Sequence, residues 1–170
     1  MIPVLTTERL TLRAPRLSDW DAYAAFRMSD RTIPIGGPDT RARAWHHFTS
    51  VSGQWHLRGY GRWIVADRAT DAPLGLVGLF HPIEWPEPEL AWSVFAEGEG
   101  RGFAFEAARA ARTHAYDTLG WTTLISLIDP ANTRSVALGH RMGAVPDGVF
   151  RHETHGAMDV WRHPAPEAFA

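Results

Sequence analysis

EGEGRGFAFEA, residues 97–107, places a glycine at every second position and then runs into a stretch rich in alanine. LAWSVFA (90–96) stands before it as a strand candidate, and the alanines of Phe103–Leu119 after it favour a helix. Gly120 stands where a left-handed residue ends such a helix, and the β-branched run TTLISLI (122–128) predicts a buried strand. The predicted unit is therefore strand, glycine turn, helix and strand.

A glycine turn that leads into a helix can bind a phosphate group. Helix N-termini present free N–H groups and a partial positive charge, and Gly98, Gly100 and Gly102 would let the backbone approach an anion closely. Arg101 can add a charge-assisted hydrogen bond. The dinucleotide pattern GxGxxG is not matched, because phenylalanine occupies the place of its last glycine. On spacing alone, the glycines could equally serve only to reverse the chain.

The rest of the chain alternates between strand and helix patterns, without internal repeats or a linker. Ser18 is the expected N-cap of the first helix, and the turn at Ala69–Pro73 joins two strand candidates into a hairpin. The expected elements are strands at 8–14, 62–67 and 74–80, helices at 19–28 and 41–57, and a Pro/Gly loop at 33–39.

Composition limits the class of protein. A chain of 170 residues fits one domain, and the absence of cysteine excludes disulfides and a catalytic thiol. The basic side chains other than histidine are all arginine, which excludes a P-loop, and a net charge of −2 argues against nucleic-acid binding. We expect neither a signal peptide nor a membrane helix, and therefore a cytoplasmic protein.

ELAWSVFAEGEGRGFAFEA (89–107) resembles the central motif of the GNAT acyltransferases, and most closely that of the RimJ/RimL-like ribosomal-protein N-terminal acetyltransferases. TERLTLRA (7–14) is similar to the first strand of that branch, and DPANTRSVALGHRMGA (129–144) to its Asn-x-x-Ser helix. The resemblance runs from Thr7 to about Phe150. The matching motif positions are Glu89, Leu90, Ala91, Trp92, Gly100, Arg101, Gly102, Phe103, Ala104, Glu106 and Ala107.

This resemblance implies an α/β (α+β) fold, with one GNAT-like N-acetyltransferase domain over residues 1–170. Its mixed, mostly antiparallel sheet would be flanked by helices and splayed at the acyl-CoA site. The implied reaction moves an acetyl group from acetyl-CoA to a primary amine, on a protein N-terminus or a small molecule, by direct attack without a metal. Homodimers are common in this family. The alternatives are a non-catalytic acyl-CoA-binding sensor or partner module, and a nucleotide site in an unrelated α/β fold.

The resemblance also implies how acetyl-CoA would be held. A backbone N–H at a strand bulge near Val94, Phe95 or Ala96 would polarise the thioester carbonyl, and the pantetheine arm would lie along the same strand edge. Asn132 is a good N-cap for a helix over Thr133–Met142, and the resemblance adds contact with pantetheine. The residues expected at the pyrophosphate are Gly100, Arg101, Gly102 and Phe103.

Two positions depart from the family pattern. Glu97 replaces the usual Gln or Arg, so its carboxylate is expected to point away from the pyrophosphate. Gly139 stands where many members place the tyrosine that protonates the leaving thiolate, and Ser135 is the nearest hydroxyl that could replace it. Glu89 is the candidate general base, acting through water. Glu89 could equally be a solvated carboxylate at a strand end.

The acceptor site is the least determined part of the sequence. Glu84, Trp85 and Glu87 would suit a cationic amine by charge and ring face, but an exposed acidic turn explains them at least as well. The loop at 33–39 and the helix at 41–57 are expected to wall the acceptor cleft.

Two groups of histidines invite a metal interpretation, His46-His47 and HETH (152–155). Neither has a third ligand at a diagnostic spacing, so we expect no metal site. Trp45 and Trp55, in the same predicted helix as the first pair, are expected in the core or in the cleft wall.

Overall fold

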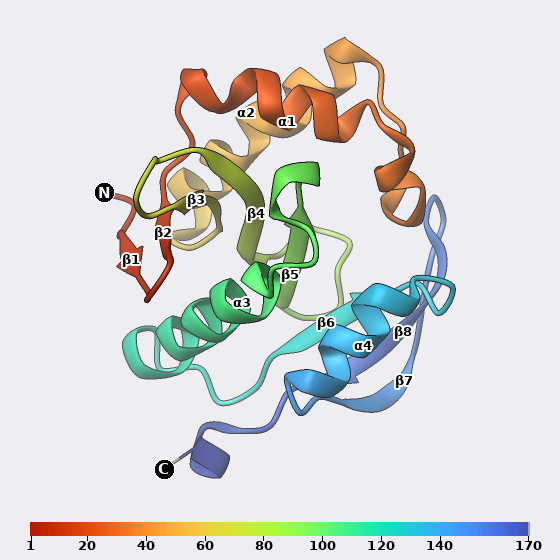
Figure 1. Cartoon of the computed structure of the whole chain (residues 1–170). Helices are drawn as coiled ribbons and strands as arrows, with labels where there is room; N and C mark the ends of the chain where they lie inside the picture. The colour runs from red at the N-terminus through yellow and green to blue at the C-terminus, as the bar shows by residue number, and fades with distance from the viewer. Residues whose placement is uncertain (170) are drawn as a thin grey trace.

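The computed structural model describes residues 1–169 and arranges them around one eight-stranded sheet (Figure 1). The strand order is β1-β2-β3-β4-β5-β6-β8-β7, with β5 and β6 parallel and every other neighbouring pair antiparallel. This confirms the expected mixed, mostly antiparallel sheet. The strands are β1 (Leu5–Thr6), β2 (Leu10–Arg13), β3 (Arg62–Asp67), β4 (Pro73–Phe80), β5 (Glu89–Val94), β6 (Ile125–Ile128), β7 (Val145–His152) and β8 (Gly156–Arg162).

Helices cover both faces of the sheet, and successive strand residues point to opposite faces. The helices are α1 (Trp20–Arg27), α2 (Arg41–Arg58), α3 (Phe103–Thr113) and α4 (Thr133–Arg141). In β3, Trp63 packs in the core beneath α3, whereas Ile64 packs with residues of α1 and α2, which lie together at the top of Figure 1. None of the helices within residues 1–169 has both the length and the apolar character needed to cross a membrane.

β5 and β6 pair at Glu89 and Ile125 and then diverge. Beyond this pair, side chains rather than backbone hydrogen bonds connect the two strands. Ser126 donates its hydroxyl proton to the carbonyl of Leu90 at 2.6 Å, and its Oγ lies 2.9 Å from Nε2 of His163. Burial lowers the pKa of His163 to about 3, so the imidazole is neutral and Nε2 must donate to Ser126. This chain of hydrogen bonds holds the two strands together at the point where they separate.

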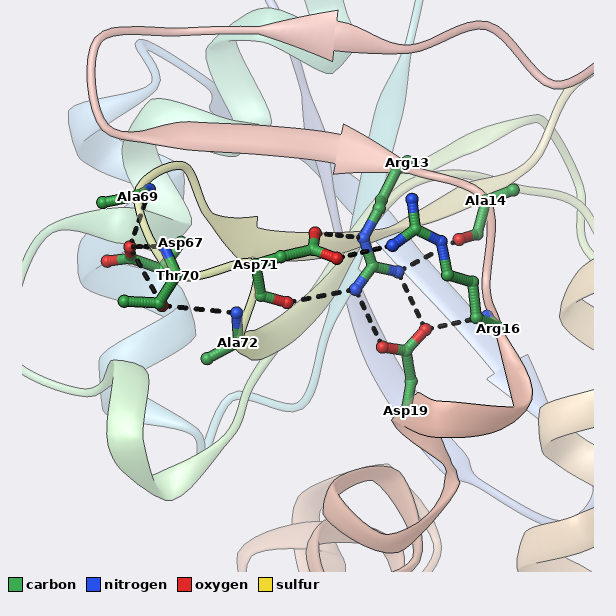
Figure 2. Close-up of polar contacts among 9 residues, drawn as sticks. All are labelled: Arg13, Ala14, Arg16, Asp19, Asp67, Ala69, Thr70, Asp71 and Ala72. Carbon is green, nitrogen blue, oxygen red and sulfur yellow. Dashed lines mark hydrogen bonds and ion pairs between the residues drawn. The ribbon is translucent and has the colours of Figure 1, made fainter.

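A buried ion-pair network fixes the start of α1 against the sheet (Figure 2). The guanidinium of Arg13, at the end of β2, donates two hydrogen bonds of 2.9 Å to the carboxylate of Asp19. Its Nε also donates to Asp71, in the turn between β3 and β4, at 2.7 Å. Asp19 completes the network by accepting from the backbone N–H of Arg16 at 2.8 Å. Because Asp19 immediately precedes α1, the network sets where that helix begins.

Several predicted boundaries near the N-terminus differ from the structure. Ser18 is not the N-cap of the first helix: it lies inside a 3₁₀ turn, Leu17–Asp19, and Asp19 is the residue that precedes α1. The first residues of the expected loop at 33–39 belong to a 3₁₀ helix, Asp30–Ile35. The first difference arises because Asp19 binds the buried guanidinium of Arg13 and the backbone N–H of Arg16, so the helix start is fixed at Asp19 rather than at Ser18.

The central unit follows the predicted order of strand, glycine turn, helix and strand. The helix expected over Phe103–Leu119 is α-helical to Thr113 and continues as a π-helical turn, His114–Thr118, before Gly120 at φ +70°. The strand expected at 122–128 is confined to β6. The long β7–β8 hairpin was not predicted, because β7 is an exposed strand without a continuous apolar pattern.

Candidate active site

A cavity of about 320 Å³ opens where β5 and β6 separate. Its walls come from these two strands, from α1, from the segment after β4, from the start of α4 and from the β7–β8 hairpin. Five side chains that the sequence predicted for the site line this cavity together: Glu84, Trp85, Glu89, Asn132 and Ser135. The cavity therefore joins the proposed base, the proposed acid and the proposed acceptor segment.

Glu89, the first residue of β5, is a buried carboxylate with 7% of its surface exposed. The indole Nε1 of Trp85 donates to its Oε2 at 2.5 Å, and the backbone N–H of Leu127 donates to its Oε1 at 3.3 Å. Burial raises the pKa of Glu89 to about 7, although both hydrogen bonds and the charge of Arg62 act in the opposite direction. The alternative of a solvated carboxylate at a strand end is therefore wrong.

Of the acidic segment before β5, Glu84 and Trp85 line the cavity and Glu87 does not. Trp85 packs its ring near Phe80 and His152, and Glu84 accepts a 2.7 Å hydrogen bond from His152 at the cavity wall. Glu87 does not line the cavity; it binds Arg162 through both carboxylate oxygens, at 2.6 and 2.8 Å. The structure thus removes Glu87 from the candidate acceptor site, because an ion pair on β8 holds it elsewhere.

The strand edge expected to bind pantetheine is not bulged. β5 pairs with β4 without a register shift up to Val94, and the chain then enters a 3₁₀ turn, Ala96–Gly98. The N–H of Phe95 donates to the carbonyl of Leu74 at 2.8 Å, so it is not free to polarise a substrate carbonyl. In an antiparallel ladder the backbone groups alternate in direction, so those of Trp92 and Val94 point away from β4, towards the gap beside β6.

Asn132 and Ser135 form the start of α4 at the opposite side of the gap. The Oδ1 of Asn132 accepts from the backbone N–H of Ser135 at 3.2 Å, which confirms Asn132 as the N-cap. The indole Nε1 of Trp92 donates to the hydroxyl oxygen of Ser135 at 3.2 Å. Because an indole can only donate, Ser135 keeps its own hydroxyl proton for another acceptor.

Gly139 has no room for the tyrosine that many relatives of this pattern carry. A Cβ built at this position would lie 3.3 Å from the Cδ1 of Ile128 and 3.4 Å from the Cε3 of Trp161. Gly139 is buried against β6 and β8, so Trp161 fills the space next to it. A larger side chain here would therefore require Ile128 and Trp161 to move.

The glycine turn enters α3 in the left-handed conformation that its composition predicts. Gly100 and Gly102 have φ values of +70° and +77°, and Gly102 precedes the first residue of α3 without any side-chain cap. Arg101 is exposed, its guanidinium lies 4.4 Å from the centre of the Phe103 ring, and it faces an open hollow of about 480 Å³ with Arg9. These residues lie outside the cavity that contains Glu89.

Comparison with known proteins shows to which family this chain belongs. A sequence model of the family described as "Acetyltransferase (GNAT) domain" matches residues 9–145. This chain belongs to the GNAT acetyltransferases. A solved acetyltransferase from Agrobacterium tumefaciens shares 36% sequence identity with it, covers 96% of this chain and 95% of its own, and superposes with a TM-score of 0.88.

More distant relatives of this GNAT acetyltransferase support the same family assignment. The Bacillus subtilis protein named "Uncharacterized N-acetyltransferase YoaA" is 25% identical over 158 residues, which cover 89% of this chain and 88% of the relative. The ribosomal-protein-S5-alanine acetyltransferase of Vibrio fischeri is 14% identical and has a TM-score of 0.75 over 97% of this chain and 98% of its own. The expected family and enzyme class are confirmed, and the fold is shared with ribosomal-protein acetyltransferases.

The segments expected to wall the acceptor cleft of this GNAT acetyltransferase contribute unequally. Pro34 and Ile35 line the cavity, and His47 is the one member of α2 that does so within the described chain. Trp55 is buried in the core, and Trp45 packs edge-on against Trp20 at the surface. Within residues 1–169, no three His, Cys, Asp or Glu side chains are placed to hold a metal ion together.

Sequence reasoning missed several polar residues of the cavity, among them Tyr23, Arg27 and Arg62. Arg27 binds Asp39 at 2.6 Å, whereas the side chains of Tyr23 and Arg62 face the cavity. These residues come from α1 and the start of β3, far from the central motif in sequence. Only the strand pairing brings them to the cavity, so no local pattern could have identified them.

Proposed function

We propose that this GNAT acetyltransferase transfers an acetyl group from acetyl-CoA to a primary amine by direct attack in a ternary complex. The observation that carries the proposal is Glu89, a buried carboxylate with a pKa of about 7 that faces the cavity between β5 and β6. A general base is most effective when its pKa lies near the working pH. Acetyl-CoA supplies the activated thioester in this reaction.

The residues around the cavity fit acetyl-CoA. The backbone groups of Trp92 and Val94 face the gap on one side, and Asn132 and Ser135 line the other. The glycine turn follows β5 and opens α3 with uncapped backbone N–H groups, which favour an anion. The chain therefore offers amides for a pyrophosphate, an open strand edge for an amide-rich arm, and a cavity for the reacting groups.

Each reacting group has a residue suited to it. The carboxylate form of Glu89 takes the proton that the amine releases, through a water molecule, as the new C–N bond forms. The N–H of Val94 would polarise the carbonyl, a contribution that is typically worth about 3–4 kcal/mol. When the C–S bond breaks, Ser135 donates its free hydroxyl proton to the sulfur, and solvent restores that proton.

The rival proposal is a GNAT module that binds acyl-CoA without turnover. Gly139 favours it, because the tyrosine position is empty and packed over by Trp161. The cavity favours an enzyme, because a binding module does not require a buried carboxylate with a near-neutral pKa beside an acceptor-sized space. Acetyl transfer to any primary amine would decide for the enzyme.

Calorimetric titration with acetyl-CoA, CoA, desphospho-CoA, ATP and NAD tests the cosubstrate. We expect binding of acetyl-CoA and CoA in preference to ATP and NAD, and roughly tenfold weaker binding in Arg101→Ala, since a charge-assisted hydrogen bond is lost. Arg151→Ala is the matched control, because Arg151 is exposed on β7 and lines no part of the cavity. Failure of both CoA forms to bind would mean that the glycine turn only reverses the chain.

A further inference from the structure

The acceptor end of the cavity contains an arginine that is not paired with a carboxylate. Arg62 begins β3, lines the cavity, and places its guanidinium 3.9 Å from the centre of the Phe80 ring. Within residues 1–169 this guanidinium takes part in no hydrogen bond and no ion pair, whereas its neighbour Arg27 is bound to Asp39. Burial lowers the pKa of Arg62, but a guanidinium remains charged in proteins.

Tyr23 adds a second donor beside Arg62. Tyr23 lies on α1, has 2% of its surface exposed and lines the same cavity. In the part of the chain that the structure describes, its hydroxyl makes no hydrogen bond, and it is not among the unpaired atoms that are fully closed off from solvent, so it is accessible from the cavity. The charge of Arg62 counteracts the rise that burial causes in the pKa of Tyr23, so the two groups are close enough to interact. A guanidinium and a phenol that face one cavity form a set of donors for an anion.

Three carboxylates line the same cavity, Glu84, Glu89 and Asp129, and Glu89 is the buried one. Arg62 and Glu89 act on each other's pKa, and among residues 1–169 they form no ion pair. The cavity therefore has two poles. The carboxyl group of Glu89 lies at the opening between β5 and β6, and the guanidinium of Arg62 lies over Phe80. Such a pair of groups matches a molecule that has an amine at one end and an anion at the other.

We propose that the acceptor of this enzyme is a small amine that also carries a carboxylate, as free amino acids do. Its amine would lie towards Glu89, and its carboxylate would accept from Arg62 and Tyr23. This inference rests on the proposed acetyl transfer and names the substrate class for it. Arg62 suits a carboxylate because its planar fork can donate two parallel hydrogen bonds.

The enclosure of the cavity supports a small acceptor over a protein N-terminus. Its volume of about 320 Å³ lies at the lower end for ligand sites. The segment Asp30–Ile35 and the tip of the β7–β8 hairpin approach each other at its rim, at the right of Figure 1. The contact is so close that a Cβ at Gly36 would lie 2.9 Å from Cε1 of His155.

Steady-state kinetics with matched pairs of acceptors test the inference. Leucine and phenylalanine are compared with leucinamide and phenylalaninamide, and kcat/KM is expressed for the neutral amine because amidation also lowers the amine pKa. We expect the wild-type enzyme to prefer each acid over its amide by about 10- to 100-fold, the effect of a charge-assisted hydrogen-bond pair. In Arg62→Gln this ratio is expected to fall to about one, while Arg151→Gln keeps it.

Tyr23→Phe provides a second, nearly isosteric variant in case Arg62→Gln does not fold. It removes a single hydroxyl, and we expect it to reduce the acid-to-amide ratio by about threefold or more. Equal turnover of acids and amides by the wild-type enzyme would overturn this inference and leave acetyl transfer intact. Absence of turnover with every amine would overturn the proposed function and this inference with it.

Discussion

Burial raises the pKa of Glu89 to about 7, so both protonation states of this carboxyl are populated near neutral pH. The cause is local: Trp85 and Leu127 donate to the carboxylate, yet their two hydrogen bonds do not replace the water that burial removes. The proton affinity of a glutamate at this strand position is thus set by the cavity rather than by the side chain alone.

Glu89→Gln should affect acceptors according to the basicity of their amines. A peptide α-amine has a reference pKa of about 7.7–8.0 and is partly neutral at pH 7, whereas an alkyl amine at about 10.4 needs base catalysis far more. We expect kcat/KM to fall less than about tenfold for the first and by about 10²- to 10⁴-fold for the second. Expressed for the neutral amine, the wild-type kcat/KM should rise with pH through about 7, as Glu89 loses its proton, and this limb should be absent from the variant. Equal losses on both amines would remove Glu89 from the role of base.

At the scale of elements, α1 is positioned by charge as well as by packing. Arg13 has a side chain that is 4% exposed, and Asp19 one that is 1% exposed, so this pair of charges is withdrawn from water. Such a pair is stabilising only while its geometry is complete. Because α1 also carries Tyr23 and Arg27 into the cavity, the network in Figure 2 connects the sheet edge to the acceptor site.

Asp19→Asn should therefore destabilise the protein substantially. The variant leaves the buried guanidinium of Arg13 with Asp71, whose side chain is 51% exposed, as its remaining carboxylate. We expect a loss of about 3 kcal/mol in the free energy of unfolding, measured by urea denaturation with an unchanged m-value. Asp21→Asn is the control, an exposed aspartate on the same helix that should change stability by less than about 0.5 kcal/mol. Equal effects of the two substitutions would contradict a special role for the network.

Elements with strong local patterns could be predicted from the sequence, and those made by tertiary contact could not. The glycine turn and the helix after it were predicted because alanine and glycine act locally, and Asn132 was identified as a cap for the same reason. Glu89 was singled out, but its burial was not foreseen. Arg62 was missed, because its neighbours in the cavity come from strands and helices distant in sequence.

At the scale of the whole molecule, two buried groups give the stability opposing pH dependences. Glu89 has a pKa raised above its unfolded value, so its contribution to stability falls as pH rises from about 4.5 to about 7. His163 has a pKa lowered to about 3, so its contribution falls as pH drops below about 6.5. Between about pH 4.5 and about pH 6.5, rising pH lowers the contribution of Glu89 to stability and raises that of His163. The two changes counteract each other, which favours a broad plateau of stability.

Glu89→Gln should separate these effects. The variant lacks the cost of ionising a buried carboxyl, so its free energy of unfolding relative to the wild type should increase by about 3 kcal/mol between about pH 4.5 and about pH 7.5, at about 1.4 kcal/mol per pH unit of the raised pKa. Urea denaturation across this range measures the difference. Glu153→Gln, at an exposed glutamate, is the control. Parallel pH profiles of Glu89→Gln and the wild type would show that Glu89 is not titrating in the folded protein near neutrality.

Apart from two contacts of histidine with a carboxylate, the ion pairs among residues 1–169 use arginine, since the chain contains no lysine. Arg9 with Glu106, Arg13 with Asp19, and Arg162 with Glu87 all use guanidinium groups, which stay protonated and are poor nucleophiles towards a thioester. An enzyme that handles a reactive acyl donor would thus expose no side-chain amine to it. If the proposed acetyl transfer takes place, acetylation of lysine side chains of the enzyme itself would not compete with the acceptor.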